Sequence, residues 1–363
     1  MDKNPTRCIK CLLPIGTSGI YFNQDGICNL CASALSELRL PSGHVSQDSI
    51  NQVVNNLRQL GKGRKYDCLV GLSGGIDSSY LLHLLVKKHK LRCLAAYYRT
   101  PFTPETIDDN VKRMVNILEV PLVEIQLSRD YHKAVARDFV VAWKKDKDPI
   151  LANLACAPCK FLHRELFIIA NNYDIPSVVH GDNKYEHTVV AAGQFLSDNI
   201  DRYSLGANLL RILLIIKRGV RLLFKYPIVF RNIGLVFKAS ILYLNPYTAY
   251  LRIRYPNILV VNYFNYADWD ETECNNALKE IGWILPHGCN SSKKADCNFA
   301  ELKNMMFRES IGANYIDFLF SNLIRYGIIS REEALKRIEK EGKGSLDRLK
   351  ETYYLLNLSD DFF

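Results

Sequence analysis

The chain has 363 residues, of which 48% are hydrophobic, 23% charged and 11% aromatic, and these fractions exclude an intrinsically disordered protein. Lys and Arg outnumber Asp and Glu by 47 to 38, which gives a net charge of +9. No run reaches the roughly 18 uncharged apolar residues that a membrane span needs, and the N-terminus resembles no signal peptide. The eleven cysteines, an odd number, argue against a secreted disulfide scaffold. We therefore expect a cytoplasmic protein with metal or thiol chemistry.

The first motif is a double cysteine pair, Cys8 and Cys11 followed by Cys28 and Cys31. Each CxxC turn directs two thiolates at one point, and the sixteen residues between the pairs allow the chain to return and close a tetrahedron. Short strands are expected at residues 20–22 and at Ile27. The spacing predicts a structural Zn2+ site in a four-cysteine ribbon over residues 1–34.

Residues 35–65 are polar and partly helical, and we interpret them as a linker. Short apolar strands then alternate with helices, a rhythm that predicts an α/β fold with a doubly wound parallel sheet. The main domain is expected over residues 66–270, and the C-terminal region, 271–363, is expected to be helical. Strands are predicted at Asp67–Leu72, Leu91–Tyr97, Leu122–Gln126, Pro176–His180 and Ile258–Asn262, and helices at Leu81–Lys88, Thr106–Leu118, Tyr131–Trp143 and Phe161–Asn171.

The strongest catalytic signal follows the first strand, where the chain reads Ser73-Gly74-Gly75-Ile76-Asp77-Ser78-Ser79. The two glycines allow positive φ and bring bare amides close to a ligand, and the helix that starts at Ser78 attracts an anion. No Gly-Lys-Ser/Thr follows, so this is not a Walker A loop. The SGGxDS pattern resembles the loop of the PP-loop superfamily of adenine-nucleotide α-hydrolases, which cleave ATP to AMP and pyrophosphate by adenylating an oxygen of the substrate.

This resemblance implies a role for residues at the carboxyl ends of three strands. Asp77 would also help to place Mg2+, because the leaving pyrophosphate needs charge neutralisation. Glu186 and His187 follow the fourth strand and would face the reacting centre. The pyrophosphate part of ATP would lie on Ser73, Gly74, Gly75, Asp77, Ser78 and Ser79, the adenine beside Ala96, Tyr97 and Tyr98, and the same sheet edge would include Gly181 and Asp182.

Four further stretches resemble a narrower family, the N-acetyl sugar amidotransferases of bacterial surface-polysaccharide synthesis. They are the N-terminal four-cysteine ribbon, SGGIDSSY, the internal Cys156-Ala157-Pro158-Cys159-Lys160 and the HGDNKYEH stretch from His180 to His187. The segment 263–270, Asp296-Cys297 and the stretch 324–334 also resemble this family. The resemblance covers most of the chain apart from 203–255.

The family resemblance implies a reaction. ATP would adenylate the carbonyl oxygen of a sugar acetamido group, and ammonia would displace AMP to leave an acetamidino group. The substrate would be an N-acetylated sugar or nucleotide sugar. No glutaminase motif is found in the sequence, so ammonia is expected from a separate glutaminase partner.

Two other functions compete with this one. A tRNA thiolation enzyme of the same superfamily would use Cys156 and Cys159 with a third cysteine, Cys289 or Cys297, to hold an iron–sulfur cluster. Four such cysteines could instead hold a second zinc, and free thiols are equally compatible with the sequence. The third hypothesis is an ATP-binding regulatory or scaffold protein without turnover.

The excess positive charge lies in one segment. Residues 202–254 contain ten Lys and Arg and no Asp or Glu, so the remaining residues are nearly neutral. Apolar residues recur there at helical spacing, and Pro227 predicts a break between two helices. Such basic helices suit packing on the sheet, an acidic partner or the inner face of an anionic membrane, whereas a nucleic-acid partner is disfavoured by the family resemblance.

Overall fold

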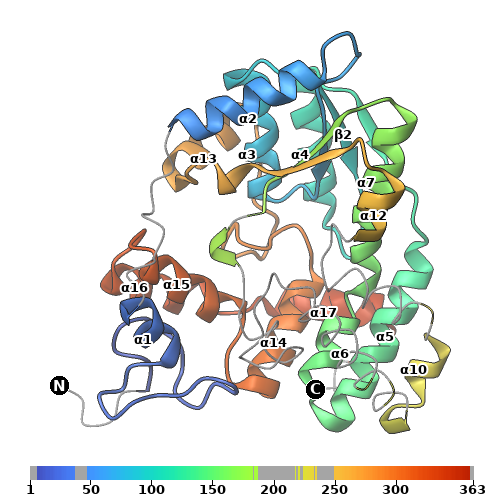
Figure 1. The fold of residues 1–363 in the computed structure, drawn as a ribbon. Helices are drawn as coiled ribbons and strands as arrows, with labels where there is room; N and C mark the ends of the chain where they lie inside the picture. Colours follow the sequence, from blue (N-terminus) through green and yellow to red (C-terminus); the bar gives the residue numbers. More distant parts are fainter. Residues whose placement is uncertain are drawn as a thin grey trace.

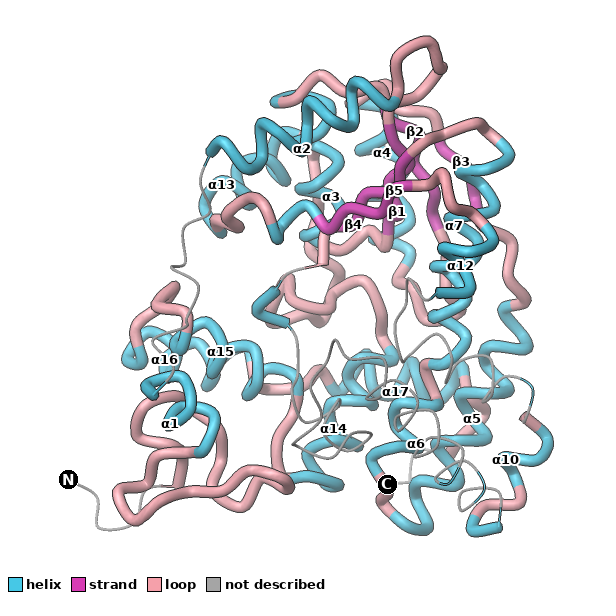
Figure 2. The backbone as a smooth tube through the Cα atoms, viewed as in Figure 1, coloured by secondary structure: helices cyan, strands magenta, loops and turns pink. Residues whose placement is uncertain are grey.

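The computed structural model describes residues 6–36, 47–182, 184–186, 217, 220, 224–232, 234 and 249–359. Its centre is a five-stranded parallel sheet with the order β3-β2-β1-β4-β5, flanked by helices (Figures 1 and 2). The predicted doubly wound α/β fold is confirmed, and each predicted strand is present with ends shifted by two residues at most. The strands are β1 (Cys68–Leu72), β2 (Cys93–Tyr97), β3 (Leu122–Glu124), β4 (Ser177–His180) and β5 (Leu259–Asn262).

The strand order fixes where a ligand can bind. The chain runs from β1 to β2 and β3 on one side and then crosses back to β4 and β5 on the other. The sheet therefore has its switch point between β1 and β4, where Leu69 pairs with Val178. In open parallel sheets, ligands bind outside the carboxyl ends of the strands at this point.

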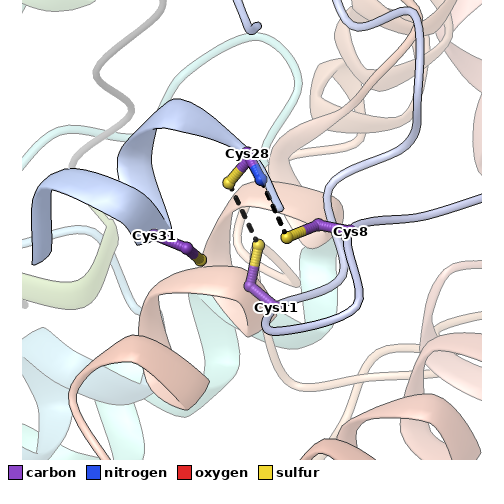
Figure 3. A group of neighbouring side chains, drawn as sticks. All are labelled: Cys8, Cys11, Cys28 and Cys31. Atoms are coloured by element: carbon purple, nitrogen blue, oxygen red, sulfur yellow. Dashed lines mark hydrogen bonds between the residues drawn. The ribbon is translucent and has the colours of Figure 1, made fainter. Parts of the chain in front are cut away.

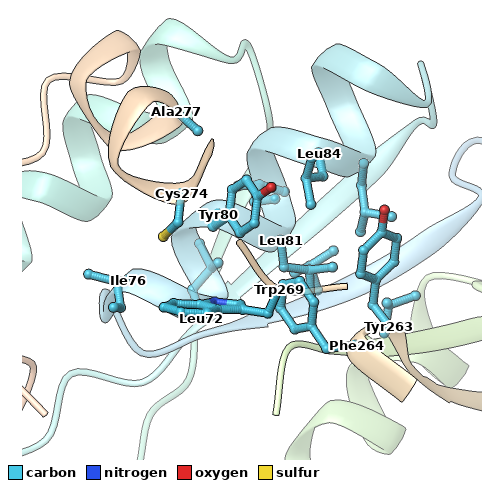
Figure 4. Close-up of a cluster of buried hydrophobic side chains, with 14 of the residues drawn as sticks. Leu72, Ile76, Tyr80, Leu81, Leu84, Tyr263, Phe264, Trp269, Cys274 and Ala277 are labelled. Atoms are coloured by element: carbon cyan, nitrogen blue, oxygen red, sulfur yellow. The ribbon is translucent and has the colours of Figure 1, made fainter. Parts of the chain in front are cut away.

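Helix α3 (Ile76–His83) lies against the sheet and carries the main apolar core (Figure 4). It continues into a π-helical turn at Leu84–Lys88. The Tyr80 ring stacks on Phe264 with centroids 6.0 Å apart, and its hydroxyl donates to Glu273 on the neighbouring helix at 2.9 Å. The other helices beside the sheet are α2 (Gln47–Leu60), α4 (Glu105–Ile117), α7 (Phe161–Asn172) and α12 (Ala249–Arg254). Helix α5 (Arg129–Asp146) packs instead against the C-terminal helices.

Helix α2 belongs to the same core, although its sequence reads as a polar linker. Ile50, Val54 and Leu57 are buried on one face and pack in the cluster that contains Cys68 and Val70 of β1. Their spacing of three and four residues gives the helix one apolar stripe, which explains why a mostly polar segment stays against the sheet.

The C-terminal region is helical, as predicted. Most of these helices begin at a side chain that accepts from the helix's own amides, and the one at Asn314 is a complete capping box with Asp317. The helices are α13 (Glu271–Glu280), α14 (Phe299–Ile311), α15 (Tyr315–Arg325), α16 (Arg331–Glu341) and α17 (Leu346–Leu355).

The N-terminal cysteine segment packs against these C-terminal helices rather than against the sheet (Figure 1). Arg7 pairs with Asp317 at 2.8 Å, and the Ser18 amide donates to the Ile311 carbonyl at 2.9 Å. Helix α1 (Asn29–Ser36) follows the second cysteine pair. The strands expected at residues 20–22 and 27 are present only as an isolated bridge between Phe22 and Cys28.

Most of the basic segment 203–255 lies outside the described residues. Pro227 directly precedes the short helix α10 (Ile228–Arg231), and Arg231 pairs with Asp138 of α5 at 3.0 Å. None of the helices in the described part of the chain combines the length and apolar character that a bilayer crossing requires. Helix α6 (Pro149–Leu154) and three short 3-10 turns (Ala157–Lys160, Lys184–Glu186 and Tyr263–Asn265) complete the described elements.

Candidate functional site

A cavity of about 230 Å³ lies at the carboxyl ends of β1 and β4, at the switch point of the sheet. We call it the switch-point cavity. Four regions far apart in the sequence supply its walls: the loop after β1, the first half of α7, the end of β4 with the loop behind it, and the segment between α13 and α14. Its lining residues are Gly71, Leu72, Ser73, Gly75, Ile76, Asp77, Ser78, Leu162, His163, Leu166, His180, Gly181, Asp182, Glu186, Ser292, Lys294 and Asp296.

The two glycines of the loop after β1 have different structural roles. Gly74 has φ of +82°, and a Cβ there would lie 2.5 Å from Cγ2 of Ile107. Gly75 has φ of −69°, which any residue adopts, but a Cβ there would lie 3.3 Å from the Asp296 carboxylate. The expectation that both glycines take positive φ is therefore wrong for Gly75, where the requirement is open space in the cavity.

The loop is held in place by hydrogen bonds around Gly74 and the serines. The Trp283 indole donates to the Gly74 carbonyl at 3.0 Å. The Ser78 hydroxyl lies 3.3 Å from both the Ser73 hydroxyl and the Gly75 carbonyl. Ser79 is buried behind the loop and does not line the cavity. The first turn of α3 lines the cavity with Ile76, Asp77 and Ser78, and the amides at a helix N-terminus attract phosphate groups.

Asp77 has a carboxylate oxygen without a partner in this cavity. Its Oδ1 is buried and receives no hydrogen bond from any described residue. Burial and the nearby Glu186 charge raise the pKa of Asp77 to about 7. A bound cation would stabilise the ionised form, and Mg2+ takes one or two carboxylates together with substrate phosphates. Asp77 therefore fits the role of a Mg2+ ligand.

The opposite wall is a charged cluster that joins Glu186 to the C-terminal region. Glu186 accepts from Lys294 Nζ at 2.7 Å and from the Tyr315 hydroxyl at 2.6 Å. Burial opposes its ionisation, but the charge and hydrogen bond of Lys294 lower the pKa of Glu186 below its usual range. Lys294 has a positive φ of 56°, an uncommon conformation for a side chain with a Cβ, which is often found at functional sites. Asp296 lies on the same segment.

Two histidines beside β4 complete the cavity. The His163 and His180 rings lie with centroids 5.6 Å apart. Burial, reinforced by its neighbour His180, lowers the pKa of His163 to about 3, and burial also lowers the pKa of His180. Both imidazoles are therefore neutral at physiological pH, so they offer hydrogen bonds to a ligand without adding charge.

Several predicted site residues lie elsewhere. Ala96, Tyr97 and Tyr98 are buried in the core and do not line the cavity, so their place beside adenine stays a prediction. The Tyr98 hydroxyl lies 3.1 Å from Nδ1 of His132 instead. Gly181 and Asp182 do line the cavity. His187 lies outside the described residues.

The internal cysteine pair is near a third cysteine from the C-terminal region. Burial raises the pKa of Cys159, and the thiols of Cys156 and Cys297 raise it further. The Cys159 sulfur also lies 3.7 Å from Nε2 of His132. Of the two candidate third cysteines, Cys297 is therefore the one near the pair. Cys289 is surrounded instead by the charged groups of Arg348, Glu301 and Asp296. Among the described residues these thiols do not gather as tightly as metal ligands do.

The four N-terminal cysteines do form such a group (Figure 3). Their sulfur atoms all lie within 4.8 Å of one another, and those of Cys11 and Cys28 are 3.7 Å apart. A tetrahedral zinc with bonds of about 2.3 Å separates its sulfur ligands by about 3.8 Å. Hydrogen bonding from Cys28 lowers the pKa of Cys11 to about 6, which favours the thiolate that a metal needs. The four residues therefore fit a structural zinc.

Sequence reasoning missed part of the site. His180 ends the fourth predicted strand, so its place at the ligand-binding edge is readable from the strand pattern alone. His163 and Lys294 carry no such signal, because α7 and a loop more than a hundred residues away supply them, and Asp296 has only the family resemblance of Asp296-Cys297.

A comparison with protein families finds a match over the residues that form most of the sheet and the SGGxDS loop. Residues 66–183 match the profile of the family described as tRNA methyl transferase HUP domain. The matched residues contain β1 to β4 and the SGGxDS loop, and they have the α/β fold of a HUP domain. An uncharacterized protein of Methanocaldococcus jannaschii is 28% identical over 126 residues, which are 34% of this chain and 44% of that protein. The match thus spans less than half of the relative.

Three solved structures resemble the chain weakly. NMN synthetase from Francisella tularensis is 13% identical with a TM-score of 0.35, covering 86% of this chain and 92% of its own. The NH3-dependent NAD synthetase of Campylobacter jejuni is 15% identical with a TM-score of 0.28, covering 53% and 91%. The U34-tRNA thiolase of Methanococcus maripaludis, which has a 4Fe–4S cluster, is 14% identical with a TM-score of 0.34, covering 94% and 91%.

Replacing Cys8 by Ser should remove the bound metal from the group of four N-terminal cysteines. Because a closed zinc site contributes its binding free energy to folding, we expect a Tm lower by about 5 °C or more. Zinc content by mass spectrometry and a thermal melt measure both effects. Lys10→Ser is the control, since Lys10 is exposed between the two cysteines. Purified wild-type protein without zinc would contradict the assignment.

Replacing Asp77 by Asn should stabilise the protein at pH 8 but not at pH 4. The folded pKa of Asp77, about 7, lies above its usual value of 3.8, so the free energy of unfolding falls as pH rises through this range. Asn resembles the protonated acid and avoids this penalty. At about 1.4 kcal/mol per pKa unit, we expect a gain of about 1–3 kcal/mol at pH 8. Denaturant titrations in the absence of Mg2+ at both pH values measure it, and an equal effect at both would contradict the raised pKa.

Proposed function

We propose that the protein is an ATP-dependent enzyme that adenylates an acceptor oxygen in the switch-point cavity. One observation carries the proposal: the SGGxDS loop, with Asp77 Oδ1 unpartnered, opens into a cavity whose other wall carries the Lys294–Glu186 ion pair. The amides of the loop and α3 would hold the pyrophosphate part of ATP, and Lys294 would offset its negative charge. The match of residues 66–183 to a HUP domain supports this use of ATP.

The acceptor that we propose is the acetamido group of an N-acetyl sugar, on the resemblance given above. The carbonyl oxygen attacks the α-phosphorus of ATP, and pyrophosphate leaves. Ammonia then attacks the resulting imidate carbon, loses a proton and expels AMP, which leaves an acetamidino group. The overall reaction consumes ATP and ammonia and releases AMP and pyrophosphate. Ammonia would come from a separate glutaminase.

Charge development explains what the cavity residues contribute. Mg2+ on Asp77 would neutralise the departing pyrophosphate. Glu186 is ionised but committed to Lys294 and Tyr315, so it orients the lysine rather than acting as a free base. The neutral His163 and His180 would offer hydrogen bonds to the acceptor, whereas their lowered pKa values make them weak bases, so water would take the proton that ammonia loses.

A second candidate, tRNA thiolation, is favoured by the presence of Cys156 and Cys297 near Cys159, although the three thiols do not gather as tightly as metal ligands do. That reaction also begins with an adenylated carbonyl oxygen, and a cysteine group would then deliver sulfur. Lys160 connects the two regions, since the charges of Cys159 and Asp182 both act on its ammonium group.

The first test compares two loop variants. Asp77→Ala should lower AMP formation by about 10²–10³ while ATP still binds, because an electrostatic group is lost. Gly75→Val should abolish ATP binding, because its side chain would enter the cavity beside Asp296. Calorimetric ATP titration and AMP detection, with ammonium and a set of N-acetylated nucleotide sugars, measure both. Asp109→Ala, on the exposed face of α4, is the control. Unchanged turnover in Asp77→Ala, or no AMP from the wild type with any acceptor, would contradict the proposal.

The cysteines separate the two acceptor chemistries. Cys159→Ser and Cys297→Ser should leave sugar amidination within about twofold, because no step uses a thiol. In a tRNA thiolase, both variants would lose sulfur transfer. Mass spectrometry of the sugar products and of nucleosides from added tRNA provides the readout, with Cys289→Ser as the matched control. Thiolated tRNA without a sugar product would replace the first candidate by the second.

A further inference from the structure

A second cavity, of about 330 Å³, lies directly behind the charged wall of the switch-point cavity. The segment 290–296 separates the two. Ser292, Lys294 and Asp296 line the switch-point cavity, while Asn290, Ser291 and again Lys294 line the second cavity. Lys294 is thus shared by both. Two adjoining cavities with a shared wall suit a second substrate beside ATP, because the reacting oxygen of that substrate must approach the α-phosphorus.

The partition between the cavities is rigid. Arg348 of α17 is buried, and its guanidinium donates to the carbonyl oxygens of Lys294 at 3.2 Å and Cys297 at 2.8 Å. It also donates to Glu301 at 3.0 Å. These bonds over-determine the backbone around Lys294 and so hold its positive φ.

The charges around the second cavity leave two exposed cations without a carboxylate partner, whereas the buried Lys293 places its ammonium 4.0 Å from the centroid of the Trp269 ring. Its three carboxylates are each engaged: Glu301 by Arg348, Glu309 by Lys147 at 2.5 Å, and Glu341 by Arg337 at 2.7 Å. Arg308 and Lys343 also line the cavity and are exposed. The Arg308 guanidinium lies 3.5 Å from the Gly342 carbonyl, beside Lys343, and neither cation pairs with a carboxylate of the described chain.

The rest of the lining suits a small polar ligand with an apolar part. Met305, Ile316 and Leu349 provide apolar surface, and Asn304 of α14 offers an amide. Helices α14, α15, α16 and α17 surround the space (Figure 1). A volume of this size is typical of small-molecule sites, and the pair of free cations is typical of phosphate recognition.

We infer that the second cavity binds the acceptor as a phosphorylated sugar, with its phosphate or diphosphate on Arg308 and Lys343. The inference rests on the proposed function, because it identifies the acceptor of that reaction. The sugar would extend from the cations past Asn304 toward Lys294, where the two cavities meet. A sugar phosphate and a nucleoside-diphosphate sugar share this chemistry.

Binding of UDP-N-acetylglucosamine, UDP and N-acetylglucosamine 1-phosphate, each titrated calorimetrically without ATP, tests the inference. The double variant Arg308→Glu/Lys343→Glu should weaken binding of the preferred probe by about tenfold or more, because two attractions become repulsions. The matched double variant Lys336→Glu/Lys350→Glu, exposed on α16 and α17, should stay within about twofold. Ala300→Phe, which fills the cavity without changing charge, should also weaken binding.

Gly75→Val separates this inference from the proposed function, since it blocks the switch-point cavity only. The probe should bind this variant like the wild type. Failure of all three probes to bind the wild type, competition with ATP for one site, or equal binding to the charge-reversed variant would overturn the inference. Loss of tRNA binding, rather than of probe binding, in that variant would also overturn it. If the probe binds as expected but no AMP forms, the cavity assignment stands and the proposed reaction fails.

Discussion

The geometry of both cavities depends on one buried cation, the guanidinium of Arg348. It donates to three backbone carbonyls of the segment 294–297 and pairs with Glu301, while its neighbour Asn298 accepts from Nε at 2.8 Å. Removing such a group would leave the partly buried Glu301 without its partner and three backbone carbonyls without their donor, which destabilises the segment. The HUP sheet supplies the loop of the switch-point cavity, but its opposite wall exists because the last described helix holds it there.

The strands and the loop after β1 could be predicted from the sequence, because each depends mainly on residues that are adjacent in the chain. Continuous apolar runs predicted the five strands, because strands buried on both faces need no alternation, and the helices between them predicted that the sheet is parallel. The loop from Ser73 to Ser79 was predictable as a phosphate-binding turn, since strand, glycines and helix start are adjacent in the chain. The role of each glycine was not, because it depends on Ile107 and Asp296, which meet the loop only in the folded protein.

The remaining wall could not be predicted for the same reason. Lys294 and Asp296 lie in a polar loop without periodicity. No nearby sequence pattern indicates that Lys294 bonds to Glu186, which also accepts from Tyr315. Helix α2 illustrates a related case: its polar composition suggested a linker, yet three apolar residues on one face suffice to attach it to the core. The overall composition of such a helix is dominated by its polar, exposed face, whereas its packing depends on the few apolar residues of the buried face.

The docking of the cysteine segment on α15 has a consequence for synthesis of the chain. Arg7 and its partner Asp317 are 310 positions apart, which the ribosome covers in about 15–60 s at about 5–20 residues per second. Throughout that interval the apolar side chains Leu13 and Ile20 have no C-terminal helix to cover them. A bound metal would let the nascent segment hold its shape alone. Such an ion would then stabilise the cysteine segment during synthesis, before the C-terminal helices that later pack on it exist.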